Sequence, residues 1–226
     1  MLRAVIFDFD GVITDSEILH FRAFNEILRE FGFELTKREY YGTYLGMTDV
    51  DCYKALIEEG RLEIDAGRIS ALVEKKNGFF ERLARKEGQI IDGVRRFLSV
   101  LRENNVPTAI CSGALLSEIE MILRQSDLRD HFGVIVAADH ISQGKPDPEG
   151  FLLTLKRLNA DGEEDIESRE CVVVEDSHWG LEAAKAAGMR TVAVTNTYKA
   201  DQLGYADKVV ASLGELGIDD LRQICD

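Results

Sequence analysis

The stretch from Val5 to Asp15, Val-Ile-Phe-Asp-Phe-Asp-Gly-Val-Ile-Thr-Asp, constrains the fold more than any other part of the chain. A short apolar run ends there in two carboxylates, Asp8 and Asp10, and a glycine follows. Because side chains two residues apart on a strand point to the same side, both carboxylates can face one spot beyond the strand. Ligands of open α/β sheets bind at this edge. Two carboxylates this close repel each other and need a cation, a shared proton or separate roles.

From Val94 onward the chain alternates between apolar strand patterns and amphipathic helix patterns. We expect further strands over residues 106–111, 134–137, 171–174, 191–194 and 208–210. We expect helices between them over residues 94–103, 115–123, 148–158 and 180–187. Near-continuous apolar strands separated by helices indicate an α/β fold, a Rossmann-like parallel sheet with helices on both faces.

A block of helical patterns follows the first strand and delays the second. The spacing of apolar residues predicts four helices: Ile18–Phe31, one opened by a capping box at Thr36, Asp49–Glu58, and Asp65–Arg85 with Gly78 as a weak point. No strand pattern interrupts this block. The sequence therefore predicts an α/β core domain from residues 1–15 and 88–226, and an inserted all-helical cap domain from residues 16–87.

The charge and composition exclude several classes of partner. The chain has 226 residues and a formal net charge of -14, which argues against non-specific binding to nucleic acid or to an anionic membrane. No apolar run reaches the roughly 20 residues of a membrane helix, and no signal-peptide core precedes Asp8. The four cysteines form no Cys-x-x-Cys pair and read as free thiols. We expect a cytoplasmic protein and a monomer.

Polar residues also follow three of the later strands. Ser112 and Gly113 precede a predicted helix, where a hydroxyl and free amides suit an anion, although Ser112 could simply cap the helix. Lys145 lies in a turn fixed by glycine and proline and could direct its charge at a phosphate, although a lone lysine is more often solvated. Glu175 and Asp176 end a very apolar strand, where a hard cation or a helix cap would explain them.

These four strand ends, in this order, resemble the four motifs of the haloacid dehalogenase (HAD) superfamily. The resemblance covers the core, and the helical insertion resembles the C1 cap of the phosphatase and phosphomutase branch. Within that branch the chain is similar to phosphoglycolate-phosphatase-like and β-phosphoglucomutase-like enzymes. Dehalogenases of the superfamily lack the second aspartate of the first motif and use no metal. Asp10 and the pair Glu175 and Asp176 therefore disfavour dehalogenation.

The resemblance implies a Mg²⁺-dependent phosphomonoester hydrolase that acts on a small phosphorylated metabolite through an aspartyl phosphate. It makes Asp8 the nucleophile and Asp10 the general acid and base. It also implies a phosphate site formed by Ser112, Gly113 and Lys145, and a metal site formed by Asp8, the Asp10 carbonyl, Asp176 and Glu175, the last directly or through water.

The cap residues decide between hydrolase and mutase. His20 and Lys76 match positions near the active site of β-phosphoglucomutase, although both could be solvated side chains on a helix. Asp49 stands where the mutase has an arginine for a second phosphate, and aspartate would repel that group. A sugar phosphomutase of the β-phosphoglucomutase type is thus the alternative, and a non-catalytic HAD-fold binding module is a third. We expect Trp179 to pack against the sheet.

Overall fold

The structure, a computed structural model, describes residues 1–45, 47–87, 90–160 and 165–226. The chain forms two compact units, which we call the core unit (Met1–Asp15 with Gln89–Asp226) and the cap unit (Ser16–Gly88). The predicted boundary fell at residues 87 and 88, and position 88 lies outside the described residues.

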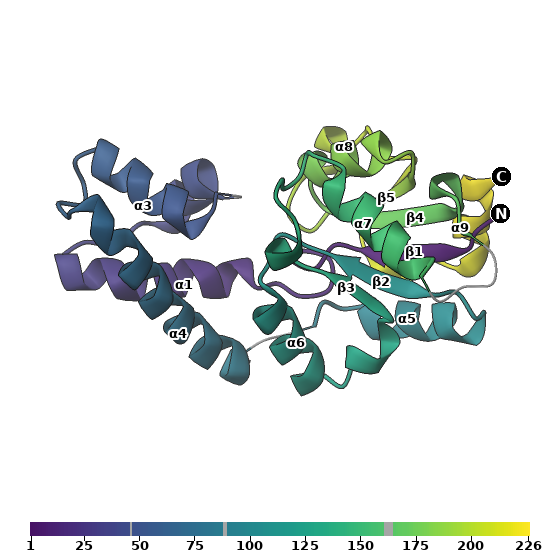
Figure 1. The fold of residues 1–226 in the computed structure, drawn as a ribbon, viewed down its shortest axis with the longest axis horizontal. Helices are drawn as coiled ribbons and strands as arrows, with labels where there is room; N and C mark the ends of the chain where they lie inside the picture. Colours follow the sequence, from purple (N-terminus) through teal and green to yellow (C-terminus); the bar gives the residue numbers. More distant parts are fainter. Residues whose placement is uncertain (46, 88–89, 161–164) are drawn as a thin grey trace. The chain divides into compact units, whose positions relative to one another are not determined.

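The core unit is built on one six-stranded parallel sheet in the order β3-β2-β1-β4-β5-β6 (Figure 1). The register places Phe7 of β1 opposite Ile110 of β2 and Val174 of β4. The carboxyl ends of these three strands therefore meet at one edge, and the strand order reverses between β1 and β4, where ligands bind in open α/β sheets. The strands are β1 (Ala4–Phe7), β2 (Thr108–Cys111), β3 (Val134–Val136), β4 (Cys171–Glu175), β5 (Arg190–Val194) and β6 (Lys208–Val210).

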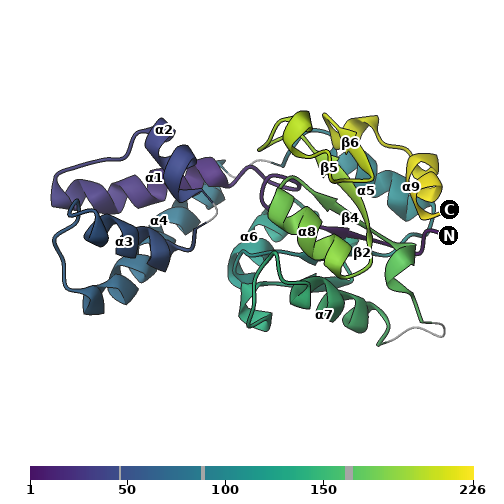
Figure 2. The ribbon, with the colours of Figure 1, turned by 90° about the horizontal axis from the view of Figure 1, so that it is seen from above.

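Helices cover both faces of this sheet, as the sequence predicted (Figures 1 and 2). Ile6 points to the face covered by α7 and α8 and packs in one buried cluster with Phe151. Phe7 points to the opposite face and meets Phe97 of α5 and Phe132 edge-on, with ring centroids 6.0 and 5.9 Å apart. The helices of the core unit are α5 (Val94–Glu103), α6 (Leu116–Gln125), α7 (Glu149–Leu158), α8 (His178–Ala186) and α9 (Ile218–Cys225).

The described residues of the cap unit form helices joined by loops, with no strand among them, and have a hydrophobic core of their own, which includes Phe24, Tyr53 and Leu72. At Gly78, the expected weak point, α4 continues without a break. The amphipathic pattern on both sides of this glycine outweighs its low helix propensity. The helices of the cap unit are α1 (Glu17–Leu28), α2 (Lys37–Glu39), α3 (Asp49–Glu58) and α4 (Ile69–Glu87), with a π-helical turn over Tyr40–Tyr44.

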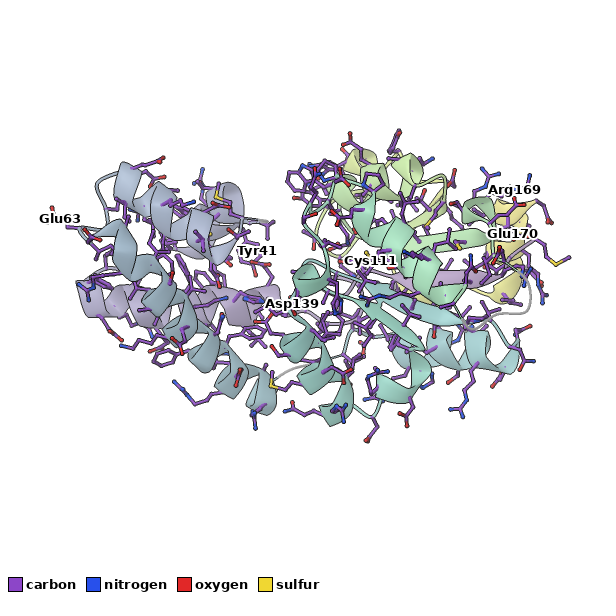
Figure 3. All side chains as sticks on the ribbon, viewed as in Figure 1. Tyr41, Glu63, Cys111, Asp139, Arg169 and Glu170 are labelled. Atoms are coloured by element: carbon purple, nitrogen blue, oxygen red, sulfur yellow. The ribbon has the colours of Figure 1, made fainter. Side chains whose placement is uncertain are left out.

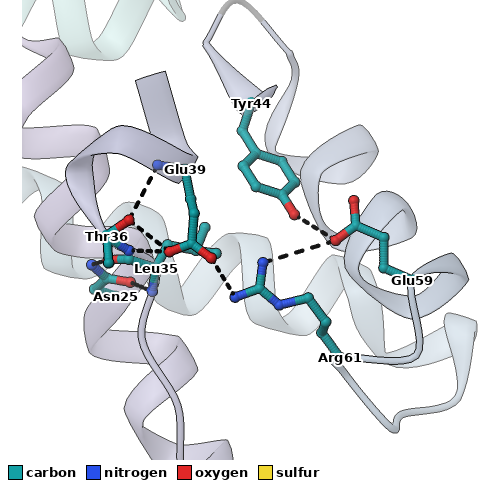
Figure 4. Close-up of polar contacts among 7 residues, drawn as sticks. All are labelled: Asn25, Leu35, Thr36, Glu39, Tyr44, Glu59 and Arg61. Atoms are coloured by element: carbon teal, nitrogen blue, oxygen red, sulfur yellow. Dashed lines mark hydrogen bonds and ion pairs between the residues drawn. The ribbon is translucent and has the colours of Figure 1, made fainter. Parts of the chain in front are cut away.

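The capping box predicted at Thr36 is present, but the helix it opens is short. The Thr36 hydroxyl accepts the Glu39 amide at 3.2 Å, and the Glu39 carboxylate accepts the Thr36 amide at 2.7 Å (Figure 4). The α-helix then ends after one turn and continues as the π-helical turn. Nearby, the buried Asn25 side chain bonds both the N–H and the C=O of Leu35, at 2.8 and 2.9 Å. These bonds fix the connection from α1 to α2.

A second polar cluster links the end of α3 to α2. Arg61 donates to Glu39 at 3.2 Å and lies 3.9 Å from Glu59, which also accepts the Tyr44 hydroxyl at 2.8 Å (Figure 4).

All four cysteines of the chain are buried and free. Among the described residues, no helix combines the length and the apolar character that crossing a bilayer requires.

Candidate active site

The first predicted motif continues directly from the central strand. The amide of Asp8 donates to the Val174 carbonyl at 2.9 Å, so the pairing of β1 with β4 extends one residue past the strand and fixes the buried Asp8 at the sheet edge. Asp10 is half-buried in the turn that follows. Gly11 has a φ of 76° and donates to the Thr14 carbonyl at 2.7 Å. Glycine adopts this left-handed conformation without strain.

Lys145 joins two of the predicted motifs. Its Nζ donates to Asp8 Oδ1 and to Glu175 Oε1, both at 2.5 Å. The ammonium also lies 5.3 Å from the centroid of the Phe151 ring. Burial alone would lower the pKa of Lys145, but the charges of Asp8 and Glu175 raise it well above its usual value. Lys145 is therefore a fixed cation at the sheet edge and not a solvated surface lysine.

Glu175 is the last residue of β4 and is fully buried. Its Oε2 accepts the amides of Asp176 and Ser177 at 3.0 Å each and the Ser177 hydroxyl at 2.9 Å. A Cβ on Gly180, in the first turn of α8, would lie only 1.7 Å from Glu175 Oε1. The glycine therefore provides the space in which this carboxylate lies, and the carboxylate in turn holds Lys145 and the start of α8.

Three carboxylates come together at this edge. Oxygen atoms of Asp8, Glu175 and Asp176, all buried, lie within 4.8 Å of one another. Burial and the negative charges of Glu175 and Asp10 raise the pKa of Asp8 to about 7, although the positive charge of Lys145 opposes this. Burial and the charges of Asp8 and Glu175 raise the pKa of Asp176 to about 8. Negative charge in this cluster exceeds the single positive charge of Lys145. A hard divalent cation with oxygen ligands fits such a donor set.

Ser112 directly follows Cys111, the last residue of β2, and so lies at the same edge of the sheet. Figure 3 labels Cys111 there, and it labels Arg169 and Glu170, which precede β4, at the opposite end of the sheet. Ser112 does not cap α6, because that helix begins only at Leu116. Its buried hydroxyl accepts the Ala114 amide at 3.0 Å.

The next two amides already have acceptors. Leu115 donates to Glu118 at 3.3 Å, and Leu116 donates to Asp139 at 2.9 Å. Because the amides of residues 114–116 are engaged, the groups of this turn suited to an anion are the Ser112 hydroxyl and the exposed Gly113.

The predicted cap residues meet one another inside the cap unit. Lys76 is only 1% exposed, and its Nζ lies 2.6 Å from His20 Nδ1 and 2.9 Å from Asp49 Oδ2. The Phe80 ring stacks on His20 with centroids 4.0 Å apart. Burial and the charge of Lys76 lower the pKa of His20 well below its usual value. Since Lys76 can only donate, a neutral His20 accepts at Nδ1 and carries its proton on Nε2.

Sequence reasoning missed the residues that hold these groups in place. Besides Gly180, they are Asn196, which donates to the Gly11 carbonyl at 2.7 Å, and Thr197, which donates to the Asp176 carboxylate. The expectation that Trp179 packs against the sheet is wrong, since its side chain lies 4.0 Å from His178 by ring centroids and is 41% exposed. Trp179 lies in the first turn of α8 on the side away from the sheet, and the buried residues of that turn are Gly180 and Leu181.

Buried carboxylates and one lysine lie at the edge of a parallel sheet where the strand order reverses, between β1 and β4. This arrangement defines an α/β enzyme with an acidic centre. The sequence profile of the haloacid dehalogenase-like hydrolases matches residues 5–194. The chain is 34% identical over 193 residues to a phosphorylated carbohydrates phosphatase of Thermotoga maritima, which covers 84% of each chain. It is 29% identical to the β-phosphoglucomutase of Bacillus subtilis over 98% of this chain and 95% of that one.

A solved structure gives the same result. CbbY from Rhodobacter sphaeroides, crystallised in complex with phosphate, matches with a TM-score of 0.86 and 26% identity, over 98% of this chain and all of that one. The chain belongs to the haloacid dehalogenase-like hydrolase family. The relative named as a phosphatase supports a phosphatase-type enzyme of that family.

Proposed function

We propose that this chain is a Mg²⁺-dependent phosphomonoester hydrolase that acts on a small phosphorylated metabolite through an aspartyl phosphate. The observation that carries the proposal is the contact of Lys145 with Asp8 and Glu175 beside Asp176, which combines a nucleophile, a fixed cation and spare carboxylate oxygens at one sheet edge. Phosphoryl transfer depends mainly on positioning and on neutralising charge, and this cluster provides both.

In the first step an Asp8 oxygen bonds to phosphorus and the bond from phosphorus to the leaving oxygen breaks. Asp10 donates a proton to that leaving oxygen. In the second step Asp10 takes a proton from water as the water oxygen attacks phosphorus, and the bond to Asp8 breaks to release inorganic phosphate. Asp10 lies close enough to Asp8 for its charge to contribute to the raised pKa of Asp8.

The remaining residues of the edge bind the phosphoryl group and the cation. We assign the phosphoryl oxygens to the Ser112 hydroxyl, the Gly113 amide and the Lys145 ammonium. Asp8, the Asp10 carbonyl and Asp176 would hold Mg²⁺, and Glu175, whose carboxylate already accepts bonds from Lys145, Asp176 and Ser177, would act through water or by positioning. When bound, Mg²⁺ neutralises charge on the transferring group and favours the ionised form of the nucleophile.

We further propose that His20 and Lys76 contact the leaving group and that this group is a carbohydrate or polyol. The relative named as a phosphorylated carbohydrates phosphatase supports this class of leaving group. Lys76 is neutralised by Asp49, and His20 is neutral, so their cluster offers no net positive charge to a second phosphate. This favours simple hydrolysis over the phosphomutase alternative, which needs to bind a bisphosphate.

The test is phosphate release from a panel of sugar, polyol and other metabolite monophosphates, with Mg²⁺ and with EDTA. We expect Mg²⁺-dependent release from a few compounds, and loss of at least about 10³-fold in kcat for Asp8→Asn. The matched control is Asp15→Asn, an exposed aspartate at the end of the same motif. Activity like that of the wild type in Asp8→Asn would refute the nucleophile. Interconversion of hexose 1- and 6-phosphates faster than phosphate release would establish the mutase instead.

A further inference from the structure

The loop after β5 reaches back to the first motif. Asn196 Nδ2 donates to the Gly11 carbonyl at 2.7 Å, across 185 residues of sequence. The N–H of Gly11 is held separately by the Thr14 carbonyl. Both polar groups of Gly11 are therefore fixed, and with them the turn that begins at Asp10.

The next residue of this loop reaches the fourth motif. Thr197 donates from its hydroxyl to the Asp176 carboxylate. The two groups enclose Gly11, because a Cβ on this glycine would lie 1.9 Å from Asp176 Oδ2 and 3.0 Å from Thr197 Oγ1. The turns that follow β1, β4 and β5 thus meet at one point, with a glycine where no side chain would fit.

Aromatic packing holds the loop in this position. Tyr198 lies edge-on to His178, with ring centroids 4.9 Å apart, and 6.4 Å from Trp179. His178 and Trp179 open α8 directly after Ser177, whose amide and hydroxyl bind Glu175. This contact explains why Trp179 lies away from the sheet: it packs against the loop that carries Thr197.

We infer that residues 196–198 are a positioning segment that sets the affinity of the acidic cluster for its divalent cation. Asn196 fixes the turn whose Asp10 carbonyl is a proposed ligand, and Thr197 fixes the Asp176 carboxylate. A carboxylate that is already oriented loses less conformational freedom when a cation binds, and hydrogen bonds to metal ligands typically change metal affinity by ~10–100-fold. The inference rests on the proposed function only in taking these residues as the metal site.

The test is calorimetric titration of Mg²⁺ into the full chain without substrate. Thr197→Val keeps the shape and removes the hydroxyl, whereas Thr197→Ser keeps the hydroxyl. Thr195→Val is the matched control, two residues away on the same loop. We expect the Kd for Mg²⁺ to rise about 10-fold in Thr197→Val and to stay within about two-fold of wild type in Thr197→Ser and Thr195→Val. Thermal unfolding in EDTA should be the same for all four proteins.

Two results would overturn the inference. One is a Thr197→Val protein that binds Mg²⁺ as tightly as the wild type. The other is a Thr197→Ser protein that binds as weakly as Thr197→Val and unfolds at an equally reduced temperature in EDTA, which would mean a purely structural role. Failure of the wild type itself to bind Mg²⁺ would instead refute the proposed metal site, so the two failures are distinguishable.

Discussion

Raising the pH of the metal-free protein from 7 to 8 is expected to destabilise its core unit. Burial raises the pKa of Asp8 to about 7 and that of Asp176 to about 8, against 3.8 for both as reference values. In this range the unfolded chain has already released both protons, whereas the native protein still holds part of them. The native state therefore binds more protons, and by linkage its stability falls as the pH rises through these values.

The magnitude follows from the excess of protons that the native state binds. At pH 7 Asp8 is half protonated and Asp176 almost fully, and between pH 7 and 8 the pair holds on average about one proton more than the unfolded chain, so this pH unit costs about 1.4 kcal/mol. His20 and His131 slightly oppose this loss of stability. Their lowered pKa values leave them neutral in the native state, whereas in the unfolded chain they still release a small fraction of a proton between pH 7 and 8. The net loss is about 1 kcal/mol, or a fall of roughly 2–4 °C in Tm.

Trp179, the only tryptophan of the chain, lies in α8 of the core unit and reports its unfolding by fluorescence. Thermal unfolding in EDTA should give the predicted fall in Tm between pH 7 and 8. Saturating Mg²⁺ should raise Tm and remove the pH dependence, since a bound cation keeps the carboxylates ionised. Asp176→Asn should flatten the profile in EDTA. A metal-free Tm that stays constant or rises over this range would refute the reasoning about the buried carboxylates.

Two further changes test the packing of each unit. Gly180→Ala places a Cβ 1.7 Å from an oxygen of the fully buried Glu175. We therefore expect the free energy of unfolding to fall by roughly 2–3 kcal/mol and phosphate release to fall with it. The control is Gly133→Ala, where no atom lies within 4 Å of the added Cβ and little should change. Asn25→Ala leaves a buried backbone N–H and C=O unpaired and should destabilise the cap unit by about 2–3 kcal/mol in denaturant, and an unchanged midpoint would contradict this.

The sheet could be read from the sequence because its strands are buried on both faces. Uninterrupted apolar runs such as Cys171–Val174 have few alternatives, and the structure extends this one only by Glu175. The helix α9 was missed because it has only eight residues, and no further strand follows it to continue the alternation of strands and helices. The helix after Thr36 shows the limit of local signals, since a complete capping box starts a helix but tertiary contacts decide how it continues.

The site divides in the same way. Asp8, Lys145, Glu175 and Asp176 were predictable because charged residues that follow buried apolar strands need compensating partners, and the structure brings these four together. The residues that position them carry no such signal. Thr197 follows a strand, as countless solvated threonines do, and its partner lies on a different strand end. Such contacts are set by the packing of three turns and not by any local pattern.

The same packing is the reason we expect this edge to bind a divalent cation. Glycines at positions 11 and 180 let backbone approach the carboxylates of Asp176 and Glu175 so closely that a Cβ would overlap them, at 1.9 and 1.7 Å. The two acids are thus packed closely against main chain and are almost completely buried. Lys145 neutralises only one of the negative charges, and burial, together with the remaining repulsion between carboxylates, raises the pKa values of Asp8 and Asp176. Because a divalent cation relieves that repulsion, the free energy that destabilises the metal-free site contributes directly to metal affinity.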